Sequence, residues 1–259
     1  MNAARSLEGL GVVLTRPEGA AGELARELAQ AGARTFLFPA LAIRPIEDSA
    51  ALDAVLDTLA KCDLAIFVSA NAVEAGFAAL GRRGITWPKG LLAAAVGELT
   101  AAALRNSGVP RVISPQEGFD SEALLALPEL QAVQGRNTIV FRGEGGREHL
   151  KQVLEARGAR VAYAECYRRE RPEVDPAPLL AAWARGEVQV VGVLSAETLE
   201  NFVAMIGPEG RSRLASTVLV VTHEAIARHA DARRFGRVLV SRPGAAALAA
   251  TLASVRDPA

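Results

Sequence analysis

The chain carries one sequence pattern twice, with a constant spacing of 126 residues between the copies. Arg16 and Arg142, for example, each follow an apolar run, and apolar residues match on either side of them. The pairs at this spacing are Arg16 with Arg142, Glu18 with Glu144, Gly19 with Gly145, Leu24 with Leu150, Leu28 with Leu154, 32–34 with 158–160, Ser69-Ala70 with Ser195-Ala196, Glu74 with Glu200, and Gly81 with Gly207. Because one spacing holds over so much of the chain, the sequence predicts two copies of one folding unit.

Short apolar runs alternate with amphipathic stretches, which is typical of βαβ units and parallel sheets. The first such stretch starts near Glu18, places Leu24 and Leu28 four residues apart, and stops at Gly32, as an amphipathic helix does. Candidate strands lie at 10–14, 35–38, 63–68, 91–96, 109–113, 137–141, 159–166, 188–194, 217–221 and 237–241. The predicted fold is therefore α/β, with two similar Rossmann-like lobes.

Proline and arginine interrupt both copies after their second strand. Pro39 and Pro45 break the first copy, and Pro172 breaks the second after three arginines. The residue before a proline favours extended geometry, so we expect extended connections near 39–45 and 167–172. Two crossings between similar lobes predict a hinged cleft.

Composition excludes several classes of function. Lys+Arg and Asp+Glu both number 29, so no overall positive field attracts nucleic acid or a membrane surface. The sequence contains no glycine fingerprint for a nucleotide in register, no zinc-binding pattern and no serine-hydrolase elbow. We expect no cofactor and no metal. No signal-peptide core and no membrane-spanning run is present, which favours a cytoplasmic protein.

Small polar residues, glycine and arginine recur at the carboxyl ends of the predicted strands. The candidate binding residues are Thr15, Arg16, Ser69, Asn71, Gly97, Thr100, Arg142, Gly143, Ser195, Ala196, Thr222 and His223. Such residues also serve simply as helix caps and tight turns. In open parallel sheets, however, ligands bind beyond these strand ends, where free helix N–H groups favour anions. Backbone amides at Ser69, Gly97, Ser195 and Thr222 are thus expected to line the cleft.

These stretches resemble the uroporphyrinogen-III synthase family along most of the chain. The similar motifs are Thr15-Arg-Pro17, Val68-Ser-Ala-Asn-Ala-Val73, Ala95-Val-Gly-Glu-Leu-Thr-Ala101, Phe119-Asp-Ser-Glu-Ala-Leu-Leu125, Val140-Phe-Arg-Gly-Glu-Gly-Gly-Arg147, Arg157-Gly-Ala159 and Cys166-Tyr-Arg-Arg169. The resemblance implies that the first strand-helix-strand unit packs with the C-terminal half. One lobe would then hold 1–38 and 173–259 and the other 43–166, with a two-stranded linker at 39–42 and 167–172.

The resemblance also implies a reaction. Hydroxymethylbilane, a linear tetrapyrrole with eight carboxylates, loses water and closes to uroporphyrinogen III with its last ring inverted through a spiro intermediate. An acid must help the hydroxyl leave, and Tyr167 matches the family's linker tyrosine. A phenol can donate a proton at neutral pH. Alternatively Tyr167 only packs at the hinge. Tyr163 is four residues earlier, so alternation along a strand places it on the same face as Tyr167. It ranks below Tyr167 as the candidate acid because it lies earlier in the strand.

Two rival functions stay open at this stage. A non-catalytic two-lobed protein that binds a small polycarboxylate or other anion would share the strand-end donors but not need Tyr167. A sugar-phosphate or nucleotide enzyme should carry a phosphate loop, which the sequence lacks. If the chain is a synthase, we expect a monomer with a tetrapyrrole substrate. The sequence leaves open whether it makes a transient contact with the upstream enzyme that forms hydroxymethylbilane.

Overall fold

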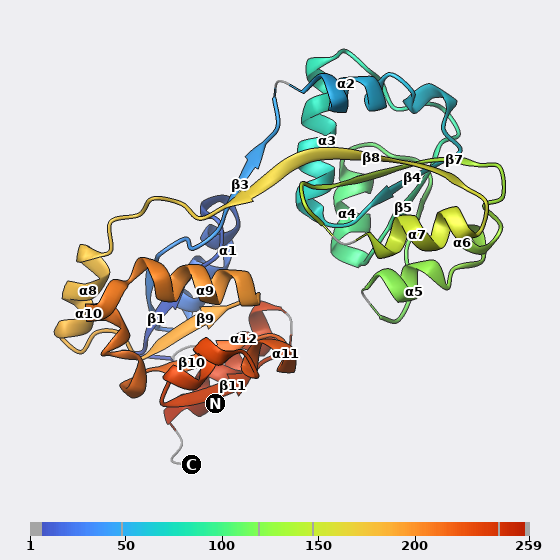
Figure 1. Ribbon diagram of the computed structural model, residues 1–259. Helices are drawn as coiled ribbons and strands as arrows, with labels where there is room; N and C mark the ends of the chain where they lie inside the picture. The colour runs from blue at the N-terminus through green and yellow to red at the C-terminus, as the bar shows by residue number, and fades with distance from the viewer. Residues whose placement is uncertain (1–6, 48, 119, 147, 243, 257–259) are drawn as a thin grey trace. The chain divides into compact units, whose positions relative to one another are not determined.

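The computed structural model describes residues 7–256 except 48, 119, 147 and 243. Phe119 and Arg147 of the motifs above, and Pro243, therefore lie outside the described residues. The chain divides into two compact units, here called unit 1 (1–42 and 170–259) and unit 2 (43–169). Each contains its own sheet (Figure 1), so the predicted α/β class with two similar Rossmann-like lobes is confirmed.

Unit 1 is a five-stranded sheet with the order β11-β10-β9-β1-β2, and all of its paired strands are parallel. Its elements are β1 (Gly11–Leu14), α1 (Glu18–Gln30), β2 (Arg34–Leu37), α8 (Ala177–Ala184), β9 (Val190–Val193), α9 (Ala196–Met205), α10 (Gly207–Arg211), η3 (Leu214–Ser216), β10 (Val218–Val221), α11 (Glu224–Ala227), η4 (Ala230–Arg234), β11 (Arg237–Val240), α12 (Ala245–Ala253) and η5 (Ser254–Arg256). The strands are mostly apolar on both faces, as expected when helices cover both.

Two buried clusters hold this sheet between its helices. One contains Trp183 of α8 and Phe202 of α9, packed on Val191 of β9. The other contains Leu24 and Leu28 of α1, which pack on β1 from the opposite face. The four-residue spacing of these two leucines places them on one side of α1, which explains why this stretch forms a helix against the sheet.

Unit 2 is a six-stranded sheet with the order β3-β8-β7-β4-β5-β6. Its elements are β3 (Ala42–Pro45), α2 (Ala50–Leu56), η2 (Leu59–Lys61), β4 (Leu64–Phe67), α3 (Ala70–Arg82), β5 (Leu92–Ala95), α4 (Glu98–Asn106), β6 (Val112–Ile113), α5 (Ser121–Leu125), α6 (Pro128–Gln131), β7 (Asn137–Gly143), α7 (His149–Ala156) and β8 (Arg160–Glu170). Helices α3 and α4 cover one face, and α5 to α7 cover the other (Figure 1). On the first face Phe67 and Phe141 stack with ring centroids 4.4 Å apart.

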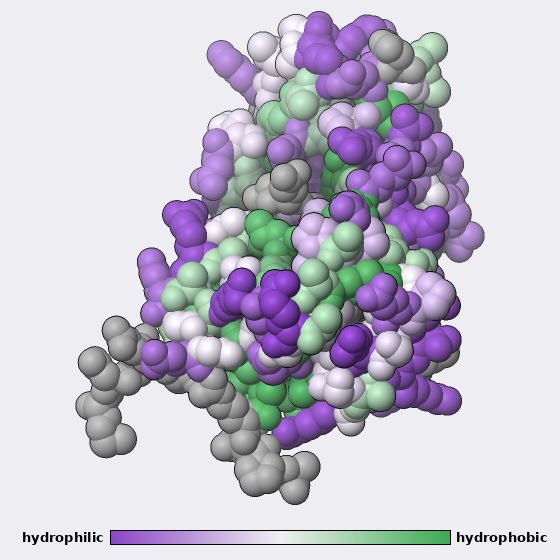
Figure 2. All heavy atoms as spheres, turned by 90° about the vertical axis from the view of Figure 1, so that its left-hand side faces the viewer, coloured by the Kyte–Doolittle hydropathy of each residue, from purple (hydrophilic) through white to green (hydrophobic). Residues whose placement is uncertain are grey.

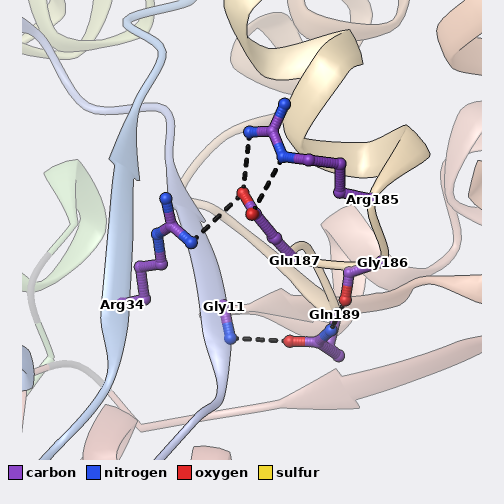
Figure 3. A network of polar contacts seen from close by, with 6 residues as sticks. All are labelled: Gly11, Arg34, Arg185, Gly186, Glu187 and Gln189. Atoms are coloured by element: carbon purple, nitrogen blue, oxygen red, sulfur yellow. Dashed lines mark hydrogen bonds and ion pairs between the residues drawn. The ribbon is translucent and has the colours of Figure 1, made fainter.

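A polar network ties the amino ends of the unit 1 strands together (Figure 3). The Glu187 carboxylate accepts two hydrogen bonds of 2.9 Å from Arg185 and lies 3.2 Å from the Arg34 guanidinium. The Gly11 N–H donates to Gln189 Oε1 at 2.7 Å, and the Gln189 N–H donates to the Gly11 carbonyl at 3.0 Å. The turn before β9 is thereby held tightly against the start of β1.

Strand β8 departs from the expected pattern at its carboxyl end. Arg142 of β7 pairs with Glu165, but the next residue, Gly143, pairs with Tyr167. Cys166 is thus the extra residue of a β-bulge, and a bulge re-aims the side chains that follow it. Cys166 and Tyr167 are both buried in the cluster beneath α3. Tyr167 therefore lies inside β8, although the sequence places it in a linker.

The bulge also separates the two tyrosines that simple alternation puts on one face. Tyr163 packs against the cluster beneath α7, whereas Tyr167 belongs to the cluster beneath α3. The prediction of a shared strand parity is wrong for this reason. Beside β8, residues 42–45 form edge strand β3, where Pro45 is tolerated because an edge strand has unpaired N–H positions. Over the described residues, the helices include none that is both long and apolar enough to cross a membrane.

Candidate functional site

A pocket opens at the carboxyl end of the unit 2 sheet, where β4, β7 and β8 finish. It is lined by Val68, Ser121, Val140, Arg142, Gly143, Gly146, Leu150, Tyr163, Tyr167 and Arg169. Tyr167 is buried, and its hydroxyl lies 3.2 Å from Ser69 Oγ. Ser69 is the N-cap of α3 and accepts a hydrogen bond of 3.1 Å from the Ala72 N–H. The phenol thus sits close to the positive end of a 13-residue helix.

This arrangement suits a proton donor. If Ser69 donates its hydroxyl hydrogen to the Tyr167 oxygen, the phenol's own hydrogen is free for a ligand in the pocket. The α3 N-terminus favours negative charge nearby, which stabilises the oxygen as it gives up that proton. Burial of the ring fixes its position without blocking the pocket side.

Arg142 closes one wall of this pocket and is itself buried. Its Nε donates to the Gly143 carbonyl at 3.1 Å and lies 3.6 Å from Glu165 Oε1, and one terminal nitrogen donates to Glu148 Oε1 at 3.2 Å. The guanidinium carbon lies 4.2 Å from the centroid of the Tyr163 ring, a cation–π contact. Two glutamates therefore already contact this guanidinium.

Tyr163 contributes the pocket's second phenol, in a different setting. Burial raises the pKa of Tyr163, and the Glu148 charge raises it further while Arg142 lowers it. The hydroxyl is buried and has no partner in hydrogen-bonding geometry among the described residues. The raised pKa makes Tyr163 a weaker acid than an ordinary phenol.

Three glycines at and just after the end of β7 are each needed for a different physical reason. A Cβ at Gly143 would lie 2.6 Å from Cε2 of the Tyr167 ring, and one at Gly146 would lie 2.7 Å from the Arg142 guanidinium. Gly145 between them has a φ of 71°, in the left-handed region that favours glycine. The Arg-Gly-Glu-Gly-Gly stretch thus lets both side chains press against the backbone of the pocket wall.

A second pocket lies at the carboxyl end of the unit 1 sheet. It is lined by Leu14, Thr15, Arg16, Leu24, Gly192, Val193, Leu194, Val220, Val221, Thr222, Ser241, Arg242, Gly244 and Leu248. Thr15 is buried and its hydroxyl donates to the Gly192 carbonyl at 2.7 Å, which joins the ends of β1 and β9. Arg16 is half-buried, and this burial lowers the pKa of its guanidinium.

The family model of uroporphyrinogen-III synthase HemD matches residues 22–250 of the chain. The chain belongs to the uroporphyrinogen-III synthase family. It is 33% identical over 220 residues to the uroporphyrinogen-III synthase of Escherichia coli K12, which covers 85% of this chain and 89% of that protein. The Salmonella typhimurium LT2 synthase is 35% identical over 192 residues, 74% of this chain and 78% of that one.

Solved structures of the family share the fold at low sequence identity. Uroporphyrinogen-III synthetase from Helicobacter pylori 26695 superposes with a TM-score of 0.62 at 12% identity, over 95% of this chain and 100% of that chain. A mutant synthase from the extremely thermophilic bacterium Thermus thermophilus gives 0.57 at 18% identity, over 95% of both chains. At these identities the likeness concerns the fold alone, and it agrees with the two α/β units described above.

The predicted site residues fall into three groups. Tyr167, Arg142 and Gly143 line the unit 2 pocket, and Ser69 bonds to Tyr167 at its edge. Thr15, Arg16 and Thr222 line the unit 1 pocket. The remaining residues lie outside these two pockets, in the first turns or at the N-caps of the helices that follow the strands: Asn71, Gly97, Thr100, Ser195, Ala196 and His223. Of these, Ser195 caps α9, with its hydroxyl accepting from the Thr198 N–H at 3.1 Å.

Exposed apolar side chains form a feature of the strand ends that sequence reasoning missed. Leu99, in the first turn of α4, is 84% exposed, and Leu37, Leu194 and Val240 are also exposed at the ends of β2, β9 and β11. The face in Figure 2 shows hydrophobic residues reaching the surface in separate patches among hydrophilic ones. The exposure of Leu99 could have been predicted from its position, because it follows Gly97 and Glu98 at the start of α4 and lies off the buried side of that helix.

Proposed function

We propose that this chain closes hydroxymethylbilane to uroporphyrinogen III, with Tyr167 as the acid that assists the loss of water. The observation that carries the assignment of Tyr167 is its hydroxyl, 3.2 Å from the serine that caps α3, on the wall of the unit 2 pocket. Membership of the synthase family supports the reaction itself. Family membership also favours the enzyme over the non-catalytic anion-binding protein. The placement of Tyr167 supports the same choice, because a protein that only binds an anion would not need this acid.

The proton movements balance in a simple way. The pyrrole nitrogen next to the hydroxymethyl group pushes electrons towards the carbon, and the C–O bond breaks as Tyr167 protonates the leaving oxygen, which departs as water. The phenolate left behind is stabilised by the Ser69 hydroxyl and by the α3 N-terminus. The same oxygen can take back the proton that the ring carbon loses after closure, so the enzyme ends unchanged.

Binding of the substrate is assigned to the strand ends. Eight carboxylates need many donors, and helix N-termini beyond parallel strands provide free N–H groups together with a favourable dipole. Thr15, Arg16 and Thr222 in unit 1, and Arg142 and Gly143 in unit 2, remain predicted binding residues. Asn71, Gly97, Thr100, Ser195, Ala196 and His223 remain predictions too, as contributors outside the two pockets. Cytoplasmic localisation, a monomeric state and a transient contact with the upstream enzyme also remain predictions.

The direct test of this proposal is the isomer of the product. With enzymatically prepared hydroxymethylbilane and no added cofactor, we expect the oxidised product to be the type III porphyrin on chromatography. Spontaneous closure without enzyme gives the symmetric isomer I, which serves as the control. A chain that leaves only isomer I, or one that loses activity on dialysis against chelator and regains it with a metal, would contradict the proposal.

Gly143→Ala should damage the site without touching any polar group. The added methyl would press on the buried Tyr167 ring, so the ring and its hydroxyl must move away from Ser69. We expect turnover to fall by about tenfold, since small misplacements of a catalytic group are costly, and the free energy of unfolding to fall by ~1–3 kcal/mol.

Gly81→Ala is the matched control, because a Cβ there meets nothing within 4 Å. It lies in α3 of the same unit, so alanine should leave turnover unchanged and stabilise the helix slightly. Steady-state kinetics and urea unfolding of both variants decide the matter. Wild-type turnover in Gly143→Ala would show that the position of the Tyr167 ring is not critical.

A further inference from the structure

The sequence Ser/Thr-Arg-Pro occurs at the ends of two strands of unit 1. Thr15-Arg16-Pro17 follows β1, and Ser241-Arg242-Pro243 follows β11. In the sheet, β9 and β10 lie between these strands, and all four run in parallel. Both arginines consequently reach the carboxyl edge of the same sheet, where they line one pocket.

Over the described part of the chain, no acidic group pairs with the charges of this pocket. Among the described residues, neither Arg16 nor Arg242 forms an ion pair or a side-chain hydrogen bond, and the lining residues include no aspartate or glutamate. Arg142 in unit 2 is the opposite case, since it already contacts two glutamates. Two guanidinium groups that share a pocket without a counterion repel one another, and a bound anion relieves that repulsion.

The remaining lining strengthens the attraction for an anion. Leucines and valines of β1, β10, α1 and α12 make up much of the wall, and they lower the local dielectric around the half-buried Arg16, whereas Arg242 is exposed. Burial lowers the pKa of Arg16, although an arginine keeps its charge at neutral pH. Thr222 adds a half-buried hydroxyl that has no partner among the described residues and can donate to the same anion.

We propose that Arg16 and Arg242 together bind one carboxylate of the tetrapyrrole substrate, and that Arg242 is thereby a further substrate-binding residue. The planar guanidinium presents paired N–H donors that match the two oxygens of a carboxylate. This inference rests on the proposed function, because it takes the anion to belong to that substrate. Arg16 is one of the predicted binding residues, whereas Arg242 extends that set.

The test compares Arg242→Gln, Arg242→Lys, Arg16→Gln and the double glutamine variant in steady-state kinetics with hydroxymethylbilane. We expect Arg242→Gln to raise KM by about tenfold with little change in kcat, the effect of one lost charge-assisted hydrogen bond. Lysine should restore part of the affinity. Because both arginines contact one carboxylate, the KM of the double variant should rise by less than the product of the two single effects.

Arg233→Gln is the matched control, since Arg233 is an exposed arginine in the segment that leads into the other end of β11. The wild-type advantage over Arg242→Gln should shrink at high salt, as expected for an exposed charge. A KM for Arg242→Gln equal to that of Arg233→Gln, or single effects that simply multiply, would overturn the inference.

Binding of uroporphyrin, a stable porphyrin with eight carboxylates, separates this inference from the proposed function. Its affinity is measured by fluorescence titration and needs no turnover. Weaker binding by Arg242→Gln than by Arg233→Gln supports the anion pocket even if the chain makes no isomer III. Unchanged binding together with normal isomer III formation overturns the inference and leaves the proposed function intact.

Discussion

Gly11→Ala should lower the free energy of unfolding of unit 1 by about 3 kcal/mol, the upper end of what overpacking usually costs. A Cβ at Gly11 would lie 1.7 Å from the Glu187 carbonyl oxygen, and that obstacle is backbone rather than a flexible side chain. The turn that carries Glu187 cannot easily retreat. The Glu187 carboxylate is held by Arg34 and Arg185 (Figure 3). Gln189 makes two hydrogen bonds to Gly11, one through its side chain and one through its backbone N–H.

Tryptophan fluorescence can measure this effect in unit 1 alone. The chain has two tryptophans, and Trp183 lies in unit 1 while Trp87 lies in unit 2. In a Trp87→Phe background, urea unfolding followed at Trp183 reports unit 1. Gly192→Ala in β9 is the control, because a Cβ there meets only the Val13 carbonyl oxygen at 3.6 Å, an ordinary contact. Equal midpoints for the two variants would show that the start of β1 adapts to a side chain.

The order of strands and helices was predictable because each element is written locally in the sequence. Apolar runs become strands and amphipathic stretches become helices, as at Glu18–Gln30, which begins and ends where predicted. The constant spacing of 126 residues further predicts that the chain contains two copies of one folding unit. Ser69, Arg142 and Gly143 could be placed near one another for the same reason, since parallel strands end at one edge of their sheet.

The parts that could not be predicted depend on contacts between distant residues. The bulge at Cys166 follows from pairing between β7 and β8, and it alone decides that Tyr167 turns towards Ser69 while Tyr163 turns towards Arg142. The two glutamates that contact Arg142 are Glu148, the N-cap of α7, and Glu165 of β8. No local pattern marks them, so the sequence could list Arg142 as a binding residue but could not show that two glutamates already contact it.

Tyr167→Phe should lower turnover by about 10²-fold or less. Loss of a positioned general acid costs ~10²–10⁴-fold, and the lower end applies because the pyrrole supplies most of the push that expels the hydroxyl. The buried ring keeps its packing in phenylalanine, so the unfolding free energy should fall by ~1 kcal/mol or less, the worth of the lost hydrogen bond to Ser69. The substrate's KM should change little, since the lost interaction acts on the leaving oxygen during bond breaking.

Tyr163→Phe is the matched comparison, since it removes the other phenol of the same pocket. That hydroxyl has no hydrogen-bond partner among the described residues, and its raised pKa makes it a poor donor, so turnover should fall far less than in Tyr167→Phe. Kinetics with hydroxymethylbilane and urea unfolding of both variants separate catalysis from packing. A Tyr167→Phe variant with a much lower melting temperature but normal turnover per folded molecule would make Tyr167 structural. Wild-type turnover at every pH in both variants would assign the proton to water, and the strand-end pockets would then act by orienting the substrate.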